Sequence, residues 1–267
     1  MTKKSPSTYK AKPVDAEGYA VYTPEEHQVW QELIARQIPV VKGRACDEYI
    51  QGIELLNLNS DRIPQCPDVS KILRSITGWT LEPVPALISF DRFFNLLANR
   101  KFPAATFIRR KEELDYLQEP DIFHEVFGHC PLLTNQAYAD FTETYGRLGL
   151  NATPEDRIML ARLYWFTIEF GLIHSAAGLK IYGGGILSSK SETIYALDSD
   201  VPLRKPFEVL EALRTPYRID IVQPVYFYIQ SFDDLFKLID MDLIALIHEA
   251  RRLGMYQPLY EVNKNER

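Results

Sequence analysis

The chain has 267 residues, of which 46% are hydrophobic, so it can bury a sizeable core as one large domain or two small ones. Its formal net charge is −6 with acidic and basic residues interspersed, which excludes a general nucleic-acid-binding surface. No run of about 18 apolar residues is present that could span a membrane. The three cysteines form no CxxC pair or disulfide framework, which indicates a reducing cytoplasm.

The sequence is expected to fold as one domain over residues 19–258. A flexible polar arm, residues 1–18, precedes this domain, and a polar tail, residues 259–267, follows it. The arm contains lysines but no apolar segment behind them, so it does not resemble a secretory signal. No internal repeat or Gly/Ser-rich linker divides the rest of the chain.

Helix signals dominate the domain. Ser, Thr or Asn residues followed by acidic or Pro residues are typical of helix N-termini. The predicted helices begin at Thr23 (ending near Arg36), Ser89, Thr134 or Asn135 (continuing through Tyr145), Thr153 (reaching Phe170) and Ser231 (with the helical region ending near Gly254).

Strand signals are few and short. The best are Ala105–Ile108, Leu179–Gly183 and Val225–Ile229, which are rich in β-branched and aromatic residues. The expected fold class is therefore mostly α (α+β). Long helices would form a basket, with small β-strand pairs near its middle.

Two of the five histidines lie close together in the segment Pro120–Leu133, PDIFHEVFGHCPLL. His124 and His129 are five residues apart, so they diverge by roughly 140° around a regular helix. Both can bind one metal only if the helix ends or unwinds between them, and Gly128 and Pro131 favour such an ending. A short capped helix with two incidental histidines is the alternative interpretation.

A lone acidic residue, Glu169, lies among apolar and aromatic neighbours in the predicted helix that reaches Phe170. Burying a carboxylate there without a partner is costly, so Glu169 is predicted to be either a metal ligand or a member of an ion pair. With His124 and His129 it would supply two imidazoles and one carboxylate. That is the ligand set of a non-haem Fe(II) site with open positions for O2 chemistry.

Three further features admit two interpretations each. Arg109 and Arg110 form either a solvated pair or a clamp in which one guanidinium binds a substrate carboxylate. The run Gly183–Gly185 lacks the context of a phosphate-binding loop, and it predicts a tight turn that lets the backbone approach a ligand. Cys130 has no second cysteine nearby, so it is predicted to be a small packing residue rather than a metal ligand.

Three linked motifs carry a resemblance to a known family: PDIFHEVFGHCPLL, then YWFTIEFGL, then YGGGILSS. In this order and at similar intervals, they resemble the pterin-dependent aromatic amino acid hydroxylases. The similarity extends from about Tyr19 to about Asp234, and it is greatest to the bacterial phenylalanine 4-hydroxylases of the family. The expected fold is therefore the catalytic-domain fold of these hydroxylases, formed by residues 19–258.

The resemblance implies a phenylalanine 4-monooxygenase that converts L-phenylalanine to L-tyrosine. It implies Fe(II) and a tetrahydropterin, either tetrahydrobiopterin or a bacterial analogue, as cofactors and O2 as co-substrate. The residues that it implies are His124, His129 and Glu169 for iron, Arg109, Trp165, Ser188, Pro120 and Phe170 for the substrate, and Phe93, Ile88 and Glu125 for the pterin.

Three alternatives remain at this point. A tryptophan hydroxylase of the same family would share the metal and the pterin. A zinc-dependent hydrolase would use Glu125 as its base, although the five-residue histidine spacing argues against it. A metal-free helical interaction module would have no reason to cluster Arg109, the two histidines and Glu169. No heptad segment follows the domain, so a monomer or dimer is expected rather than a coiled-coil tetramer.

Overall fold

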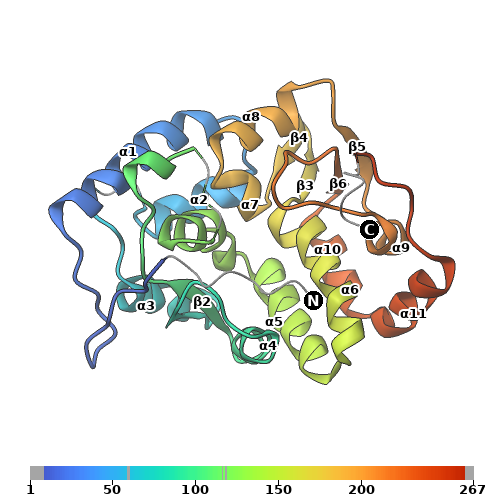
Figure 1. The fold of residues 1–267 in the computed structure, drawn as a ribbon, viewed down its shortest axis with the longest axis horizontal. Coiled ribbons are helices and arrows are strands. Elements are labelled where there is room, and N and C mark those ends of the chain that lie inside the picture. The colour runs from blue at the N-terminus through green and yellow to red at the C-terminus, as the bar shows by residue number, and fades with distance from the viewer. Residues whose placement is uncertain (1–8, 59–60, 116, 118, 262–267) are drawn as a thin grey trace.

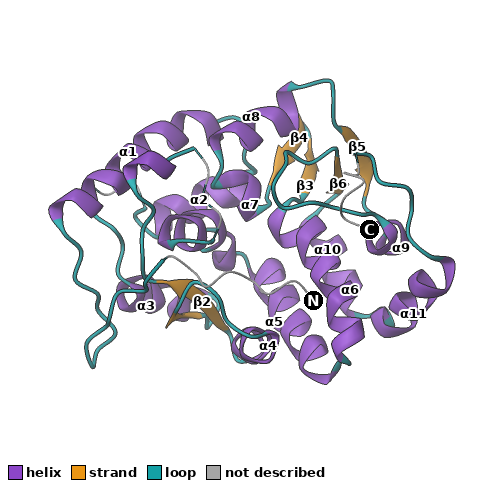
Figure 2. Ribbon diagram, in the orientation of Figure 1, coloured by secondary structure: helices purple, strands orange, loops and turns teal. Residues whose placement is uncertain are grey.

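The computed structural model describes residues 9–58, 61–115, 117 and 119–261. Helices form most of the molecule, and the strands gather in two places (Figure 2). The mostly α fold class predicted from the sequence is confirmed. The α-helices are α1 (Pro24–Val41), α2 (Asp47–Leu55), α3 (Cys66–Ile76), α4 (Phe90–Ala98), α5 (Gln136–Asn151), α6 (Pro154–Tyr164), α7 (Gly184–Leu187), α8 (Lys190–Asp198), α9 (Val209–Arg214), α10 (Phe232–Ile239) and α11 (Leu243–Leu253).

Side-chain caps begin several of these helices at the predicted residues. The Thr23 hydroxyl accepts from the Glu26 main-chain N–H, and the Glu26 carboxylate accepts from the Thr23 N–H, which completes a capping box. The side chains of Ser89, Asn135 and Thr153 cap α4, α5 and α6. Each cap satisfies a main-chain donor that the first turn leaves without a partner.

The predicted end of the first helix near Arg36 is wrong, because α1 continues to Val41 with Pro39 in its last turn. The buried side of the helix continues through Gln37 and Val41. Gln37 donates from Nε2 to the main-chain oxygen of Leu187 at 2.7 Å. Tertiary contacts therefore extend this helix past a residue that lacks a main-chain donor.

The predicted bounds of the later helices hold for the C-terminal region but not for α5. α5 continues past Tyr145 to Asn151. The C-terminal helical region forms α10 and α11, and Gly254, with φ of 76°, ends α11 as predicted. Glycine adopts this left-handed conformation without the steric penalty of a Cβ atom.

The strands form a parallel pair and a four-stranded mixed sheet. β1 (Thr80–Val84) pairs with β2 (Lys101–Ala105). The larger sheet has the order β4-β3-β6-β5, in which only the β3–β4 hairpin is antiparallel. Its strands are β3 (Leu172–Ser175), β4 (Gly178–Ile181), β5 (Leu203–Pro206) and β6 (Val225–Ile229). β6 has the predicted bounds, and β4 ends two residues earlier than predicted.

The predicted strand Ala105–Ile108 is wrong except for Ala105, which ends β2. The next three residues are buried, but their partners lie in loops rather than in a sheet. The main-chain oxygen of Thr106 accepts from the Tyr22 hydroxyl at 2.9 Å, and that of Phe107 accepts from the Ile122 N–H at 2.9 Å. An apolar β-branched run predicts burial here, but not strand pairing.

The core lies between the long helices. α1 lies beside α8, and the four-stranded sheet follows next to α8, with α9 and α10 close to it (Figure 1). The segment 123–129 passes through the middle of the core. Trp30 contacts Phe123 edge to face at 5.6 Å, and Tyr49 contacts Phe127 at 6.0 Å. The histidines of this segment are therefore held in place by closely packed apolar and aromatic side chains.

Residues 9–18 of the predicted arm contact the domain. The Tyr9 ring stacks on Phe107 at 4.9 Å, and its hydroxyl donates to Glu113 at 2.6 Å. The Thr106 hydroxyl donates to the main-chain oxygen of Lys12 at 2.8 Å. This part of the arm is thus held in place, and the rest of it, residues 1–8, lies outside the described residues. The division of the chain into arm, domain and tail stays a prediction.

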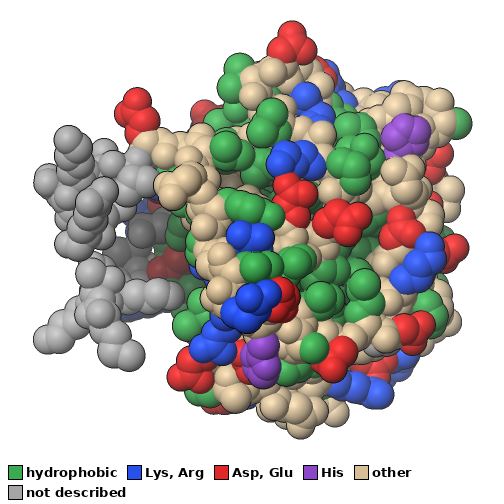
Figure 3. Space-filling view, turned by 90° about the vertical axis from the view of Figure 1, so that its right-hand side faces the viewer, with side chains coloured by type: hydrophobic (Ala, Val, Ile, Leu, Met, Phe, Trp, Pro, Cys, Tyr) green, Lys and Arg blue, Asp and Glu red, His purple; other side chains and the backbone are tan. Residues whose placement is uncertain are grey.

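The surface mixes charges of both signs. Figure 3 shows acidic and basic side chains interspersed with apolar ones over one face, without a basic patch on that face. Within the described part of the chain, no helix combines the length and the apolar character needed to cross a bilayer.

Candidate metal centre

A π-helix brings the two histidines of the central segment together. Phe123–His129 forms η2, which is a π-helix rather than an α-helix. Its wider turn closes hydrogen bonds between residues five apart, so His124 and His129 lie on one side of it. The helix does not end between them; it takes the more loosely wound π form instead. Gly128 does not end the helix; it lets η2 pack against α7, since a Cβ there would lie 2.7 Å from the Gly184 main-chain oxygen.

A second π-helix supplies the carboxylate. α6 ends at Tyr164 and continues as η4 (Trp165–Glu169), so the predicted single helix to Phe170 changes type before its end. Glu169 is the last residue of η4. Single π-turns inside α-helices occur often at functional sites, and here both segments that carry the candidate ligands adopt this form.

The three candidate ligands converge. The Nε2 atoms of His124 and His129 are 3.2 Å apart, and the Glu169 carboxylate lies 3.4 Å from His129 Nε2 and 3.8 Å from His124 Nε2. All three ligand atoms lie within 4.8 Å of one another. Among the described residues, no other group of three or more His, Cys, Asp or Glu side chains has this geometry.

The protonation states suit a cation. Burial lowers the pKa of His124 to about 4, so its imidazole is neutral at neutral pH. Burial alone would raise the pKa of Glu169, but the imidazoles of His129 and His124 outweigh it and keep the carboxyl ionised. A neutral His124 imidazole and an ionised Glu169 carboxylate that face the ring of His129 fit a divalent metal ion.

The two imidazoles are fixed in different ways. His124 Nδ1 lies 2.9 Å from the Ser188 hydroxyl, so a hydrogen bond sets its ring plane. His129 Nδ1 is buried and has no hydrogen-bond partner among the described residues. Its ring is held by packing, because the ring of Phe102 lies 5.2 Å away and the backbone of Gly184 passes directly beside Nδ1.

The glycine run Gly183–Gly185 passes close to these ligands. A Cβ on Gly184 would lie 2.4 Å from His129 Nδ1, and a Cβ on Gly185 would lie 2.8 Å from Glu169 Oε2. The predicted close approach of the backbone is therefore present. What it approaches is the side chains of the candidate metal centre.

A cleft of about 500 Å³ opens beside His124 and Glu169, and we name it the metal cleft. The substrate-binding residues predicted from the family resemblance all line it: Arg109, Pro120, Trp165, Phe170 and Ser188. Asp115, Leu117, Glu119, Gly185, Ser189, Ser191, Glu192 and the residues Ile219–Val222 complete the lining.

Aromatic rings form one side of the metal cleft. The Trp165 indole is stacked between Phe170, at 4.3 Å, and Tyr217, at 4.5 Å. Tyr217 belongs to the segment 216–222, which we name the wall loop because its later residues line the metal cleft. This aromatic side is the most favourable surface of the metal cleft for an apolar ring of a ligand.

Arg109 supplies the positive charge of the metal cleft. It is buried, and Asp121 accepts from its Nε at 2.8 Å and from its Nη2 at 2.9 Å. Burial opposes ionisation of Asp121, but the Arg109 charge and the donated hydrogen bonds lower the pKa of this carboxyl below its ordinary value. The solvated-pair interpretation is therefore wrong for Arg109, although Arg110 is exposed.

The three residues predicted to bind a pterin lie outside the lining of the metal cleft. Phe93 is half-buried on α4, and its ring contacts Tyr164 at 5.4 Å. Ile88 is half-buried just before α4. Glu125 is buried on η2, and burial, with Glu169 nearby, raises the pKa of its carboxyl well above the ordinary value.

Several residues of the site were not found from the sequence. Asp121 stands inside the histidine motif, where an acid in an apolar segment was a usable signal, but its pairing with Arg109, twelve residues away, was not. No local sequence signal marks Tyr217, Glu192 or Gln223, because each reaches Trp165 or the metal cleft only through the tertiary fold.

Two imidazoles and a carboxylate beside an aromatic cleft define a mononuclear metal site of the kind that non-haem oxygenases use. The profile of the biopterin-dependent aromatic amino acid hydroxylases matches residues 6–246, and the chain belongs to this family. It is 58% identical to the phenylalanine-4-hydroxylase of Pseudomonas aeruginosa over 252 residues, which are 94% of this chain and 96% of that one.

Solved structures show the same fold. The apo phenylalanine hydroxylase of Colwellia psychrerythraea superimposes with a TM-score of 0.91 at 55% identity, covering 94% of this chain and 97% of that one. The phenylalanine hydroxylase of Chromobacterium violaceum with bound oxidized Fe(III) gives a TM-score of 0.87 at 43% identity, covering 95% and 94%. The fold predicted from the family resemblance is confirmed.

Proposed function

We propose that this protein is a phenylalanine 4-monooxygenase. It converts L-phenylalanine to L-tyrosine with O2 and a tetrahydropterin, at a single Fe(II) held by His124, His129 and Glu169. The observation that carries the proposal is the convergence of these three ligand atoms within 4.8 Å at the end of an aromatic cleft. The Fe(III) bound by the Chromobacterium violaceum relative supports iron as the metal.

The chain's own residues keep the ligand set in one arrangement. A metal on His124 Nε2 requires the ring proton on Nδ1, which then donates to the Ser188 hydroxyl. Asp121 accepts from the His124 main-chain N–H at 3.0 Å, so the start of η2 is fixed to the same carboxylate that holds Arg109. When bound, iron and reduced pterin supply the activation of O2 for insertion of one oxygen atom into the aromatic ring.

The metal cleft orients an amino acid by its two ends. Asp121 uses two of the five N–H donors of the Arg109 guanidinium and holds its plane in place. Other N–H groups of Arg109 bind the substrate carboxylate, while Trp165, Phe170 and Pro120 enclose the ring. Fixing both ends places one ring carbon toward the metal ligands, which is the positioning that an enzyme of this kind supplies.

The pterin belongs on the side of the metal ligands that faces α4. Phe93 would hold the pterin as its stacking residue, Ile88 would lie nearby, and Glu125 would face the cofactor through water. The structure supports this arrangement because the Phe93 ring contacts Tyr164 at 5.4 Å, and Tyr164 directly precedes η4, which carries Glu169. These residues therefore share one neighbourhood with the metal centre.

The test is anaerobic loading of the protein with Fe(II), followed by O2, a tetrahydropterin and L-phenylalanine, with tyrosine measured by chromatography. Tyrosine that requires all four components supports the proposal. Bound iron without tyrosine and without pterin oxidation contradicts it. Omission of each component in turn is the control.

Two alternatives are separated by the same assay. A tryptophan hydroxylase would oxidise the pterin and prefer tryptophan in competition with phenylalanine. A zinc hydrolase would need Zn²⁺ and no O2; the π-helical spacing of the histidines disfavours it, because zinc peptidases carry histidines four apart on an α-helix.

We further propose a cytoplasmic location and a monomer or dimer. The three cysteines are free and buried, which suits a reducing compartment. Fractionation of the native host and sedimentation of the purified protein test these two points.

A further inference from the structure

Gln223 is a buried glutamine between the wall loop and β6, and it is 1% exposed. Burying a side-chain amide is unfavourable unless its polar groups are hydrogen-bonded. The residue contacts none of the three candidate ligands through a hydrogen bond that the structure shows. Its burial therefore needs a different explanation.

Every hydrogen-bonding group of the Gln223 side chain is used. Its Oε1 accepts from Trp165 Nε1 at 3.1 Å. Its Nε2 donates to the main-chain oxygens of Arg218, at 2.8 Å, and Ile221, at 2.9 Å. Its main-chain N–H donates to Glu192 at 2.9 Å. Among neutral side chains, only a carboxamide offers both an oxygen acceptor and two N–H donors in this geometry.

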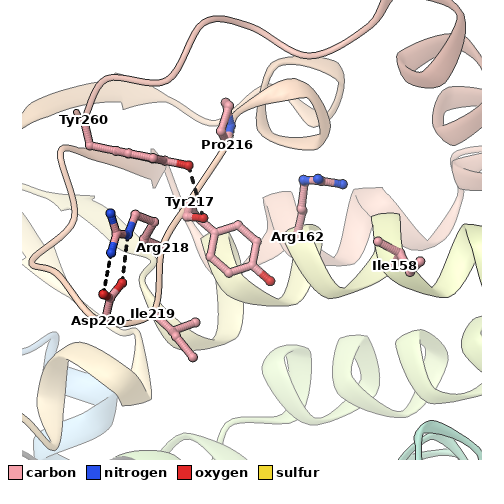
Figure 4. Close-up of a pocket in the computed structure, with 8 residues that line it drawn as sticks. All are labelled: Ile158, Arg162, Pro216, Tyr217, Arg218, Ile219, Asp220 and Tyr260. Carbon is pink, nitrogen blue, oxygen red and sulfur yellow. Dashed lines mark hydrogen bonds and ion pairs between the residues drawn. The ribbon is translucent and has the colours of Figure 1, made fainter. Parts of the chain in front are cut away.

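The wall loop has no regular secondary structure, and it lines two clefts. Its residues Ile219–Val222 line the metal cleft. The loop also lines a second cleft of about 510 Å³ (Figure 4). The second cleft is formed by Ile158, Arg162, Pro216, Tyr217, Arg218, Ile219, Asp220 and Tyr260. Because the loop carbonyls do not pair in a sheet, the Gln223 amide takes the place of a strand neighbour.

Trp165 is held on both ring faces and at one edge. Phe170 and Tyr217 stack on its faces, and Tyr217 comes from the wall loop itself. Gln223 accepts from its N–H at the edge. A partly buried indole N–H normally needs such a partner, and here the partner also fixes the loop that supplies one of the stacking rings.

We propose that Gln223 is a positioning residue for the aromatic ring of the substrate. Its carboxamide fixes the Trp165 indole and the wall loop relative to each other, which gives the ring-binding side of the metal cleft one shape. The inference rests on the proposed function, since it assigns Trp165 to the substrate ring. It adds a residue that touches neither substrate nor metal and acts through Trp165.

The test compares Gln223→Met with wild type. Methionine has a similar length and shape but can neither accept from Trp165 nor donate to the loop carbonyls. We expect KM for phenylalanine to rise roughly tenfold, the effect of losing one or two net hydrogen bonds. We also expect fewer tyrosines per tetrahydropterin oxidised, with iron content unchanged. Gln230→Met, on an exposed glutamine at the far end of β6, is the matched control and should behave as wild type.

A double-mutant cycle tests whether Gln223 acts through Trp165. In a Trp165→Phe background the indole N–H is already gone, so Gln223→Met should raise KM clearly less than it does in wild type. An equal rise in both backgrounds overturns the assignment. So does a loss of thermal stability with wild-type KM and coupling, because it shows a purely structural role.

Gln223→Glu keeps the test valid if the methionine variant does not fold. It retains an acceptor for Trp165 but sets a carboxylate oxygen against the two loop carbonyls in place of the donors, so we expect KM to rise and coupling to fall. Wild-type kinetics in this variant overturn the assignment. If wild type itself forms no tyrosine, the proposed function fails, and this inference fails as well. If wild type forms tyrosine and the variants match it, only the role of Gln223 fails.

Discussion

The two sides of the metal cleft are built differently. On the metal side, the ligands come from η2 and η4, and α7 packs against them through Gly184 and Gly185. The backbone there is satisfied by its own helical hydrogen bonds. On the substrate side, the wall loop has no regular structure and is held by the Gln223 amide and the Trp165–Tyr217 stack.

The difference matches what each side has to do. Metal ligands must be held within a fraction of an ångström, and helices provide such precision better than loops. A pocket for a substrate side chain can vary, and irregular segments on a rigid scaffold are where such variation occurs. Variants on the metal side should therefore change iron content and turnover together. Variants on the substrate side should change KM and coupling while iron stays bound.

The largest effect is expected from Glu169→Ala. It removes one of the three ligands, so the two imidazoles must hold the metal alone. We expect most of the bound iron and essentially all turnover to be lost, a larger loss than the roughly 10–100-fold that follows removal of a residue that only supports a ligand. Iron analysis and tyrosine formation measure it. Glu155→Ala, at an exposed position of α6, is the control, and retained iron in the Glu169 variant would remove Glu169 from the ligand set.

Gly184→Ala sharpens the comparison on the metal side without replacing a ligand. The new Cβ would lie 2.4 Å from His129 Nδ1, so the imidazole or α7 must move. We expect iron affinity to fall by roughly 10–100-fold, as for other residues that orient a metal ligand. Competition with a chelator measures the affinity.

Gly43→Ala is the control for this clash. Gly43 has φ of 81°, and beyond its chain neighbours no heavy atom lies within 4 Å of the position that a Cβ would take, so alanine there strains only the backbone. It should lower thermal stability and leave iron affinity unchanged. If Gly184→Ala behaves in the same way, close packing of α7 does not fix His129.

Local sequence signals pointed to the residues of the metal side, whereas most residues of the substrate side were predicted only from the family resemblance. His124, His129 and Glu169 are unusual residue types in apolar local segments, and such conflicts are visible in one dimension. The π-helical form of η2 was not visible, because it depends on packing around Gly128 rather than on a local signal. The five-residue spacing indicated an irregularity, but its nature came only from the structure.

The substrate side depends on contacts that no local pattern records. The Trp165–Gln223 hydrogen bond joins residues 58 positions apart. Helix starts were predictable because caps such as Thr23 and Thr153 are local chemistry. Thr106 and its neighbours were predicted as a strand because apolar β-branched runs signal burial, and the loops that satisfy their backbone are distant in sequence.

Arg109→Lys tests the substrate side. Lysine keeps the charge but loses the planar fork that Asp121 holds and that a carboxylate can bind at two points. We expect KM for phenylalanine to rise roughly tenfold with iron content unchanged, as for loss of one charge-assisted hydrogen bond. Steady-state kinetics with iron analysis measure both. Arg110→Lys, at the exposed neighbouring position, should match wild type, and an unchanged KM in Arg109→Lys would rule out the clamp.

The smallest effect concerns Glu192, which ties the wall loop to α8. Its Oε1 accepts from the Gln223 N–H and from the Tyr226 hydroxyl, and burial raises the pKa of its carboxyl above the ordinary 4.5. The folded state therefore holds this proton more tightly than the unfolded chain does. The contribution of Glu192 to stability is largest below the unfolded pKa and falls as pH rises through the folded pKa.

Glu192→Gln keeps the acceptor and removes the ionisation. We expect the free energy of unfolding of this variant to fall less than that of wild type as pH rises from about 4.5 towards neutrality, measured by urea titration at several pH values. The same substitution at Glu155 should follow the wild-type curve. Parallel curves for Glu192→Gln and wild type would mean that α8 holds the wall loop without the cost of burying a charge. The buried Glu192 carboxyl of the substrate side would then, like the Glu169 carboxyl of the metal side, not have a raised pKa.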